Sequence, residues 1–204
     1  MRVQILENYV PQTRTAKTYP HYRNHDWFKA IKTGKVDAAF FTANCAVSPR
    51  GNAVLGAGLA KEVQETFMKL GINTKQVLGK KYQTYHINRK DAAANKHMKT
   101  RFNIVASKVT HVIELKMKDK QTNIYSFPVK DGFWQHASVS MITRSCEQAV
   151  KIANEKGYKV CILNFPGIGN GKLSGRYKEL VDMMNKVLDE RFTVLQKPTA
   201  KEGK

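Results

Sequence analysis

The chain has 204 residues, of which 35 are Lys or Arg and 16 are Asp or Glu, so its formal net charge at pH 7 is +19. This length predicts one domain that is large enough to bury a hydrophobic core. No secretory apolar region and no apolar run of membrane length is visible, so we expect a cytoplasmic protein without a membrane partner.

Cysteine usage agrees with that compartment. Cys45, Cys146 and Cys161 are few and scattered, which predicts reduced thiols rather than disulfides. No spacing of Cys and His predicts a metal site, and we expect no cofactor.

Residues 1–35 begin with an alternating segment, Met1–Leu6, which predicts a strand at the edge of a sheet or first in it. Aromatic and basic residues then mix between Tyr19 and Phe28, a composition that can stack nucleobases while neutralising phosphates. Alternatively, a short helix over 26–32 packs Trp27 and Phe28 against the sheet, and we favour this interpretation for those two side chains.

Residues 36–67 read as strand, polar residue, glycine loop and helix. The apolar run Val36–Ala43 predicts a buried strand, and Asn44 stands at its end. Gly56 and Gly58 then open a helix whose apolar residues share one face. Such a loop holds a phosphate, because unpaired amides and the positive end of the helix dipole face the anion. The alternative is a tight turn that lets the helix pack closely on its strand.

The middle of the chain, 74–130, is the most basic part and its elements are less regular. Tyr82, Tyr85 and Ile87 alternate as in a strand, and 91–99 reads as a polar helix or loop. We then expect a strand over 109–115 with His111 packed in the core, and a strand over 123–129 that ends at Lys130.

The C-terminal part repeats the strand, glycine loop and helix. We expect an amphipathic helix over 137–155, a strand over 160–165, a loop containing Gly167, Gly169 and Gly171, a helix over 176–188, a strand over 192–195 and a disordered tail over 197–204. Two glycine loops that can each hold a phosphate predict a ligand with two phosphates, or with a phosphate and a sugar, which the loops bind from both sides. Strands alternating with helices predict one α/β domain over 1–196, with a mixed β-sheet sandwiched between helices in three layers, α/β/α.

These motifs resemble the macro domain, the ADP-ribose-binding family. The resemblance rests on Val36–Asn44, on Gly56-Ala57-Gly58-Leu59-Ala60 and on Phe165-Pro166-Gly167-Ile168-Gly169-Asn170-Gly171. Phe127-Pro128-Val129-Lys130, with Trp134 after it, is similar to one branch, whose members remove ADP-ribose from acidic side chains or from DNA bases and include antitoxins that reverse DNA ADP-ribosylation.

The resemblance implies the site residues. In that branch the lysine matching Lys130 is catalytic, and an amine that has lost its proton can attack the anomeric carbon as a nucleophile. Asn44 would be the second catalytic residue and would bond the distal ribose hydroxyls; its alternative role would be to cap the turn at the strand end. The expected ADP-ribose contacts are Asn44, Leu55, Gly56, Ala57, Gly58, Leu59, Pro166, Gly167, Ile168, Gly169, Asn170 and Gly171. The family's Asp that meets the adenine is absent, and Glu7 or Asn8 would take its place.

A second departure concerns the substrate. Hydrolases that act on protein carboxylates have an Asp after the second glycine loop, whereas residues 171–175 here read Gly-Lys-Leu-Ser-Gly. The expected function is therefore an ADP-ribosyl hydrolase that favours ADP-ribose on nucleic acid. The alternatives are a non-catalytic module that sequesters ADP-ribose or a related nucleotide, and an ADP-ribose-1″-phosphate phosphatase.

The distribution of charge bears on the same question. Residues 1–35 carry +5 and residues 74–120 carry +9, so most of the charge lies outside the family-like segments and coincides with basic insertions near 11–35 and 74–108. A nucleic-acid partner and a lysine-rich solvated surface are equally good interpretations. We expect a monomer.

Overall fold

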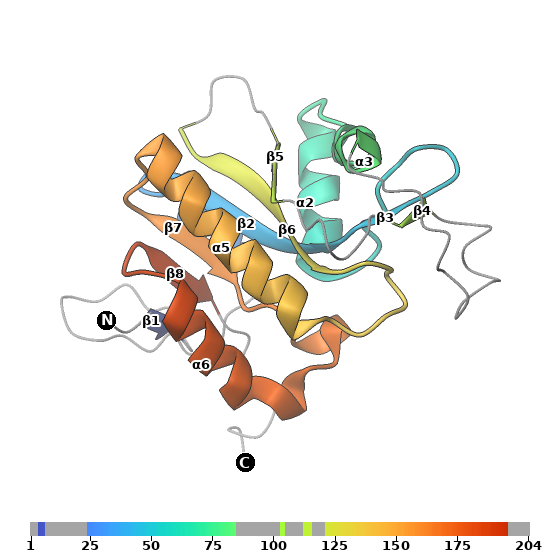
Figure 1. Ribbon diagram of the computed structural model, residues 1–204. Helices are drawn as coiled ribbons and strands as arrows, with labels where there is room; N and C mark the ends of the chain where they lie inside the picture. The colour runs from blue at the N-terminus through green and yellow to red at the C-terminus, as the bar shows by residue number, and fades with distance from the viewer. Residues whose placement is uncertain (1–3, 7–23, 85–102, 105–111, 116–120, 196–204) are drawn as a thin grey trace, which may run out of the picture.

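A computed structural model describes residues 4–6, 24–84, 103–104, 112–115 and 121–195 of the chain (Figure 1). Its main sheet has six strands in the order β1-β8-β7-β2-β6-β5. Neighbours pair in parallel except β5 and β6, which are antiparallel, so the sheet is mixed as predicted. The strands are β1 (Gln4–Leu6), β2 (Ala38–Asn44), β5 (Ile113–Leu115), β6 (Asn123–Lys130), β7 (Cys161–Asn164) and β8 (Phe192–Leu195).

Strand β2 lies in the middle of the sheet, and its side chains alternate between two cores. Ala39, Phe41 and Ala43 pack into one core, whereas Ala38 and Phe40 pack into the other. All five side chains are buried. A strand that is buried on both faces needs a continuous apolar run, which is what residues 38–41 supply.

Helices cover both faces of the sheet, which confirms the three-layer α/β/α fold in one α/β domain (Figure 1). Side chains of α1, α2 and α3 contribute to the core on one face, and those of α5 and α6 contribute to the core on the other. The helices are α1 (Asn24–Lys32), α2 (Gly58–Lys69), α3 (Thr74–Thr84), α5 (Val139–Lys156) and α6 (Tyr177–Val187).

The aromatic residues of α1 belong to the core. Trp27 is fully buried, its Nε1 donates to the carbonyl oxygen of Phe40 at 3.1 Å, and its ring meets Phe28 and Phe41 edge to face. The packing interpretation of Trp27 and Phe28 is therefore confirmed. The rest of the aromatic and basic run, from Tyr19 to Arg23, lies outside the described residues.

The strand expected around Tyr82 is wrong, because this residue lies on helix α3. Leu78 and Tyr82 are four residues apart, both are fully buried, and Tyr82 donates its hydroxyl to Ser126 Oγ at 3.1 Å. Lys80 lies midway between them and is exposed, whereas in a strand it would share their face, so the burial pattern fits a helix and not a strand. A short two-stranded sheet, β3 (Ala46–Val47) with β4 (Asn103–Ile104), was not predicted.

Several predictions lie outside the described residues. These are Glu7 and Asn8 at the adenine, Tyr85 and Ile87 in a strand, the polar segment 91–99, the core role of His111, and the tail 197–204.

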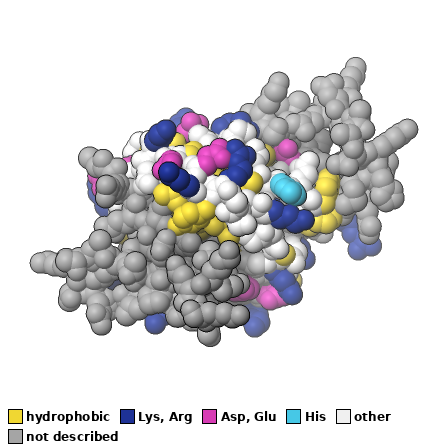
Figure 2. All heavy atoms as spheres, turned by 90° about the horizontal axis from the view of Figure 1, so that it is seen from below, with side chains coloured by type: hydrophobic (Ala, Val, Ile, Leu, Met, Phe, Trp, Pro, Cys, Tyr) yellow, Lys and Arg dark blue, Asp and Glu magenta, His cyan; other side chains and the backbone are white. Residues whose placement is uncertain are grey.

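The described residues carry a smaller share of the charge than their number suggests. They hold 19 of the 35 Lys and Arg residues and 12 of the 16 Asp and Glu residues, a net charge of +7. Figure 2 shows one face on which basic and acidic side chains of the described residues lie next to one another. The remaining +12 belongs to residues outside the described segments. No helix among the described residues is long and apolar enough to span a membrane.

Candidate functional site

The carboxyl ends of β2, β6 and β7 open into a cleft of about 860 Å³. In open α/β sheets ligands bind at this edge, where loops leave the strands. Two glycine loops form its walls, one before α2 and one after β7. They approach each other closely, since a Cβ atom added to Gly58 would lie 3.7 Å from Nδ2 of Asn170.

The first glycine loop presents the N-terminus of α2 to the cleft. Ala57 occupies the N-cap position without a side-chain hydrogen bond to the helix, and the first turn contains no acidic residue. Gly58 has a φ of +57°, which a residue with a Cβ adopts only with strain. Uncapped amides and an unopposed helix dipole make this end of a twelve-residue helix suited to an anion.

The second glycine loop forms a 3₁₀ turn, η2 (Gly169–Gly171), before a second 3₁₀ turn, η3 (Ser174–Arg176). Gly167 and Gly169 have φ values of +83° and +73°. Lys172 follows with a φ of +56° and is the sole non-glycine residue with a positive φ in the described part of the chain. This loop therefore turns sharply and exposes main chain to the cleft.

Asn44 lines the cleft, and its side chain is already engaged with the first loop. Its Nδ2 donates to the carbonyl oxygen of Val54 at 2.7 Å, and its Oδ1 accepts from the amide of Ala46 at 2.9 Å. It thus caps the turn at the strand end. An amide side chain has a second N–H and a second lone pair, so these two bonds still leave capacity for a ligand.

Lys130 reaches the same edge because β6 shifts register there. Ala43 pairs with Pro128, but Asn44 pairs with Lys130, so the bulge at Val129 sets Asn44 and Lys130 opposite each other. Pro128 has no amide hydrogen, and an irregular position of this kind is where a central strand accommodates proline. The two predicted polar side chains are brought together by this irregularity.

The amine of Lys130 bridges two segments of the cleft wall. Its Nζ donates to the carbonyl oxygens of Phe133 and Asn170, both at 3.0 Å. The residue is only 8% exposed. Burial lowers the pKa of the Lys130 amine below its ordinary value, and the positive charge of Lys172 lowers this pKa further.

Comparison with solved structures finds the same fold elsewhere. The macrodomain of Mycobacterium tuberculosis DarG matches with a TM-score of 0.53 and 17% identity, over 81% of this chain and 91% of that one. The macrodomain of Thermus aquaticus DarG matches with a TM-score of 0.53 and 17% identity, over 82% and 93%. Thermosipho africanus DarTG, solved in complex with ADP-ribose, matches with a TM-score of 0.53 and 15% identity, over 81% of this chain and 39% of that one. This chain has the macro-domain fold. No protein-family model and no curated protein sequence matches it.

Within this macro-domain fold most of the predicted site residues lie together on the cleft. They are Asn44, Gly56, Ala57, Gly58, Leu59, Lys130, Gly167, Ile168, Gly169, Asn170 and Gly171. Leu55 and Pro166 do not line it: both are buried, and Leu55 belongs to the hydrophobic core.

The macro-domain cleft also contains residues that we did not predict. Asn164 ends β7, and its amide joins β2 by two bonds of 2.8 Å, one from the Thr42 amide to Oδ1 and one from Nδ2 to Thr42 Oγ1. A polar residue at a strand end, the signal that pointed to Asn44, was available for Asn164 as well. Phe133 and Trp134, in the segment that follows Lys130, line the cleft as well.

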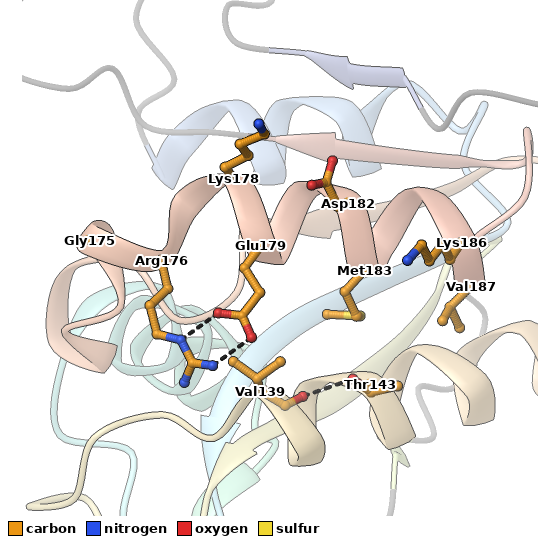
Figure 3. A pocket seen from close by; sticks show the side chains of 10 residues that line it. All are labelled: Val139, Thr143, Gly175, Arg176, Lys178, Glu179, Asp182, Met183, Lys186 and Val187. Atoms are coloured by element: carbon orange, nitrogen blue, oxygen red, sulfur yellow. Dashed lines mark hydrogen bonds and ion pairs between the residues drawn. The ribbon is translucent and has the colours of Figure 1, made fainter.

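A second hollow lies between α5 and α6 and does not contain any predicted site residue (Figure 3). Val139, Met183 and Val187 form its apolar part, and Arg176 and Glu179 pair across one end. Its charged side chains are exposed and lie on helices, without glycine loops or strand ends. The candidate site is therefore the cleft. The described residues include no group of three or more His, Cys, Asp or Glu side chains placed to hold a metal ion.

Proposed function

We propose that this chain binds ADP-ribose in the cleft and hydrolyses its bond to a macromolecule, with nucleic acid the favoured carrier. The observation that carries the proposal is the Lys130 amine, held on the cleft wall by the carbonyl oxygens of Phe133, just after β6, and of Asn170 in the second glycine loop. The DarTG structure that shares this fold holds ADP-ribose.

Binding would use the two loops for the two phosphates. The N-terminus of α2 offers amides and a positive dipole, and the second loop offers main chain without bulky side chains. Asn44 would bond the distal ribose next to Lys130.

Hydrolysis would use Lys130 as an amine nucleophile. A neutral amine has two N–H donors and one lone pair, and the two carbonyl oxygens match the two donors. The nitrogen would attack the anomeric carbon, a C–N bond would form as the bond to the carrier breaks, and the carrier would leave with the proton that the attacking nitrogen loses. Water then attacks the same carbon, which releases ADP-ribose and restores the amine.

A non-catalytic binding module is the second candidate, and one observation favours it. The same two bonds would let Lys130 act as a clamp between the end of β6 and the second glycine loop. In that case the lysine shapes the cleft and no bond is broken.

Parallel incubation distinguishes these functions. The chain would be mixed with DNA carrying ADP-ribosylated thymidine, with ADP-ribosylated protein and with ADP-ribose-1″-phosphate, and the products would be separated by chromatography. We expect free ADP-ribose from the DNA. Binding without any product identifies the module, and phosphate release from the third probe identifies a phosphatase.

Calorimetry with free ADP-ribose tests the place of binding. Gly56 lines the cleft, has no positive φ, and has no atom within 4 Å of an added Cβ, so Gly56→Glu adds charge without strain. We expect a large loss of affinity in Gly56→Glu and a smaller one in Gly56→Gln, which is matched in size. Equal affinities in both variants and the wild type would place the ligand elsewhere.

A further inference from the structure

In the described part of the chain, Lys130 and Lys172 are the only residues with a titratable side chain that line the cleft. The other lining residues are glycines, apolar residues and uncharged polar residues such as Asn44 and Asn164. Hydrolysis at the anomeric carbon needs a nucleophile and, where the leaving atom is a weak acid, a proton donor as well. The proposed function assigns Lys130 to the first task, so Lys172 is the candidate for the second.

The main chain of Lys172 is held in a conformation that favours glycine. Its φ is +56°. The amide of Lys172 donates to the carbonyl oxygen of Gly169 at 2.9 Å, and the amide of Leu173 donates to that of Gly167 at 2.9 Å. The loop is thus fixed in a conformation that costs a lysine free energy and would cost a glycine little. Strained residues of this kind gather at functional sites, which points to a use for the Lys172 side chain.

The same loop brings Lys172 next to the proposed nucleophile. Lys130 Nζ donates to the carbonyl oxygen of Asn170 at 3.0 Å, and Asn170 precedes Lys172 by only two residues. The charge of Lys172 lowers the pKa of Lys130, after the larger effect of burial, so the two side chains interact. Lys130 is buried and Lys172 is exposed. Unlike environments for two titratable groups are how a site holds one without its proton and the other with it.

We propose that Lys172 is the general acid of this site, and that its ammonium group gives a proton to the leaving atom of the carrier while Lys130 attacks the anomeric carbon. The inference deepens the proposed function and rests on it. A C–N bond forms, and the bond to the carrier breaks with its electron pair going to the carrier atom. That atom takes a proton from Lys172, and Lys172 then takes the proton that the Lys130 nitrogen loses. The net transfer is one proton from Lys130 to the carrier.

A general acid narrows the class of carrier. Its contribution grows as the leaving atom becomes a weaker acid. A carboxylate is stable without a proton at neutral pH and leaves without help, whereas the oxygen of a hydroxyl group leaves poorly unless it is protonated. The proposed acid therefore suits carriers that are joined to ADP-ribose through a weakly acidic atom.

The test uses two synthetic probes, phenyl ADP-riboside and 4-nitrophenyl ADP-riboside, which differ only in the nitro group. Nitrophenol is the stronger acid, so its anion leaves without a proton donor and phenol does not. We would measure kcat/KM for each probe at neutral pH, because this quantity includes the step in which the aryl group leaves. The ratio of the two values within one variant does not depend on how much of the protein is folded.

In Lys172→Met we expect kcat/KM for the phenyl probe to fall about a hundredfold and that for the nitrophenyl probe to fall much less. The ratio of nitrophenyl to phenyl values should therefore rise about tenfold or more. Lys172→Arg keeps the positive charge and the strained main chain, but a guanidinium does not give up its proton, so the ratio should rise there as well. Lys178→Met changes a lysine outside the cleft and should keep the wild-type ratio.

Three results would overturn the assignment. A ratio that stays at the wild-type value in Lys172→Met excludes a proton donor at this position and leaves the proposed function intact. Wild-type rates in Lys172→Arg, with a loss in Lys172→Met, show that Lys172 acts only as a positive charge. If the wild type binds ADP-ribose but hydrolyses neither probe, the proposed hydrolysis and this inference fall together.

Discussion

Lys130 is the residue on which the proposed chemistry depends. We expect Lys130→Ala to lose turnover by orders of magnitude, because removal of a nucleophile removes the covalent route. The affinity for free ADP-ribose should change much less, since the glycine loops supply most of the contacts. Lys130→Arg should not restore turnover, because a guanidinium stays protonated. Initial rates with ADP-ribosylated DNA, and calorimetry with ADP-ribose, measure both effects.

Lys178→Ala is the control for that experiment, since this lysine lines the hollow between α5 and α6 (Figure 3). Wild-type activity that survives in Lys130→Ala would exclude the amine nucleophile. The hydrolysis would then use a water molecule near Asn44.

The pH dependence of turnover tests the role of Lys172. Its charge lowers the pKa of Lys130, after the larger effect of burial. The nucleophile is the neutral amine, so turnover should rise with pH as Lys130 loses its proton, and this rise should occur below the ordinary pKa of a lysine. In Lys172→Met the pKa of Lys130 should increase, which moves the rise to higher pH and lowers the rate at neutral pH.

Rates from about pH 6 to about pH 11 with saturating substrate give this profile, because the range spans neutral pH and the ordinary pKa of a lysine. Lys178→Met is the charge-matched control. A profile that is identical in Lys172→Met and the wild type would contradict electrostatic coupling between the two lysines.

At the scale of elements, α3 supports the site through a close contact with the loop before α2. A Cβ atom at Gly79 would lie 2.0 Å from the carbonyl oxygen of Gly51 and 2.7 Å from the amide of Ala53. Alanine normally stabilises a helix interior by about 1 kcal/mol relative to glycine. Here the atoms that the new Cβ would meet belong to the main chain, which can move aside only at a high energetic cost. We therefore expect Gly79→Ala to lower the free energy of unfolding by about 1–3 kcal/mol.

Urea unfolding measures the effect, with Gly175→Ala as the control because nothing lies within 4 Å of its added Cβ. Val54, whose carbonyl oxygen accepts from Asn44, follows the same loop, so affinity for ADP-ribose should fall as well. A Gly79→Ala variant as stable as the control would mean that α3 does not press on this loop in solution.

Strands and glycine loops could be predicted from the sequence because their signals are local. The apolar run before Asn44 and the glycines of both loops mark their own positions along the chain. Helix α3 was missed because Tyr82, Tyr85 and Ile87 fit an alternation, while the helical spacing from Leu78 to Tyr82 was overlooked.

The geometry around Lys130 is not local, and no pattern reveals it. The amine meets a carbonyl oxygen 40 residues later in the chain, and the bulge that sets Lys130 beside Asn44 depends on how β2 and β6 pair. The motif resemblance identified Lys130. The burial of its amine and the two carbonyl oxygens that accept from it are visible only in the folded chain. The place of Phe133 and Trp134 on the cleft was missed for the same reason.

At the scale of the whole molecule, nucleic-acid binding should depend on the basic residues outside the described segments, which carry +12 of the net charge. Affinity for single-stranded DNA should fall steeply with salt and depend little on base sequence. Changing five of these residues to Gln should weaken binding and make it less dependent on salt, because fewer counterions are released when fewer phosphates are neutralised. The five are Arg89, Lys90, Lys96, Lys99 and Arg101.

A matched variant removes five charges from the described, exposed surface instead. Its positions are Lys69, Lys151, Lys156, Lys159 and Lys178. Fluorescence anisotropy at several salt concentrations compares the two variants. An equal decrease in affinity would indicate that net charge alone matters, and absence of binding at low salt would remove nucleic acid as the partner.

The central place of β2 has a consequence for synthesis on the ribosome. Its hydrogen-bonding neighbours are β6, which begins at Asn123, and β7, which begins at Cys161. At about 5–20 residues per second, the ribosome needs roughly 4–16 s after finishing β2 before β6 begins to appear. During that interval the apolar segment 38–41 has neither sheet partner, so the newly made chain is most prone to aggregate, and most in need of a chaperone, before the half that completes the cleft exists.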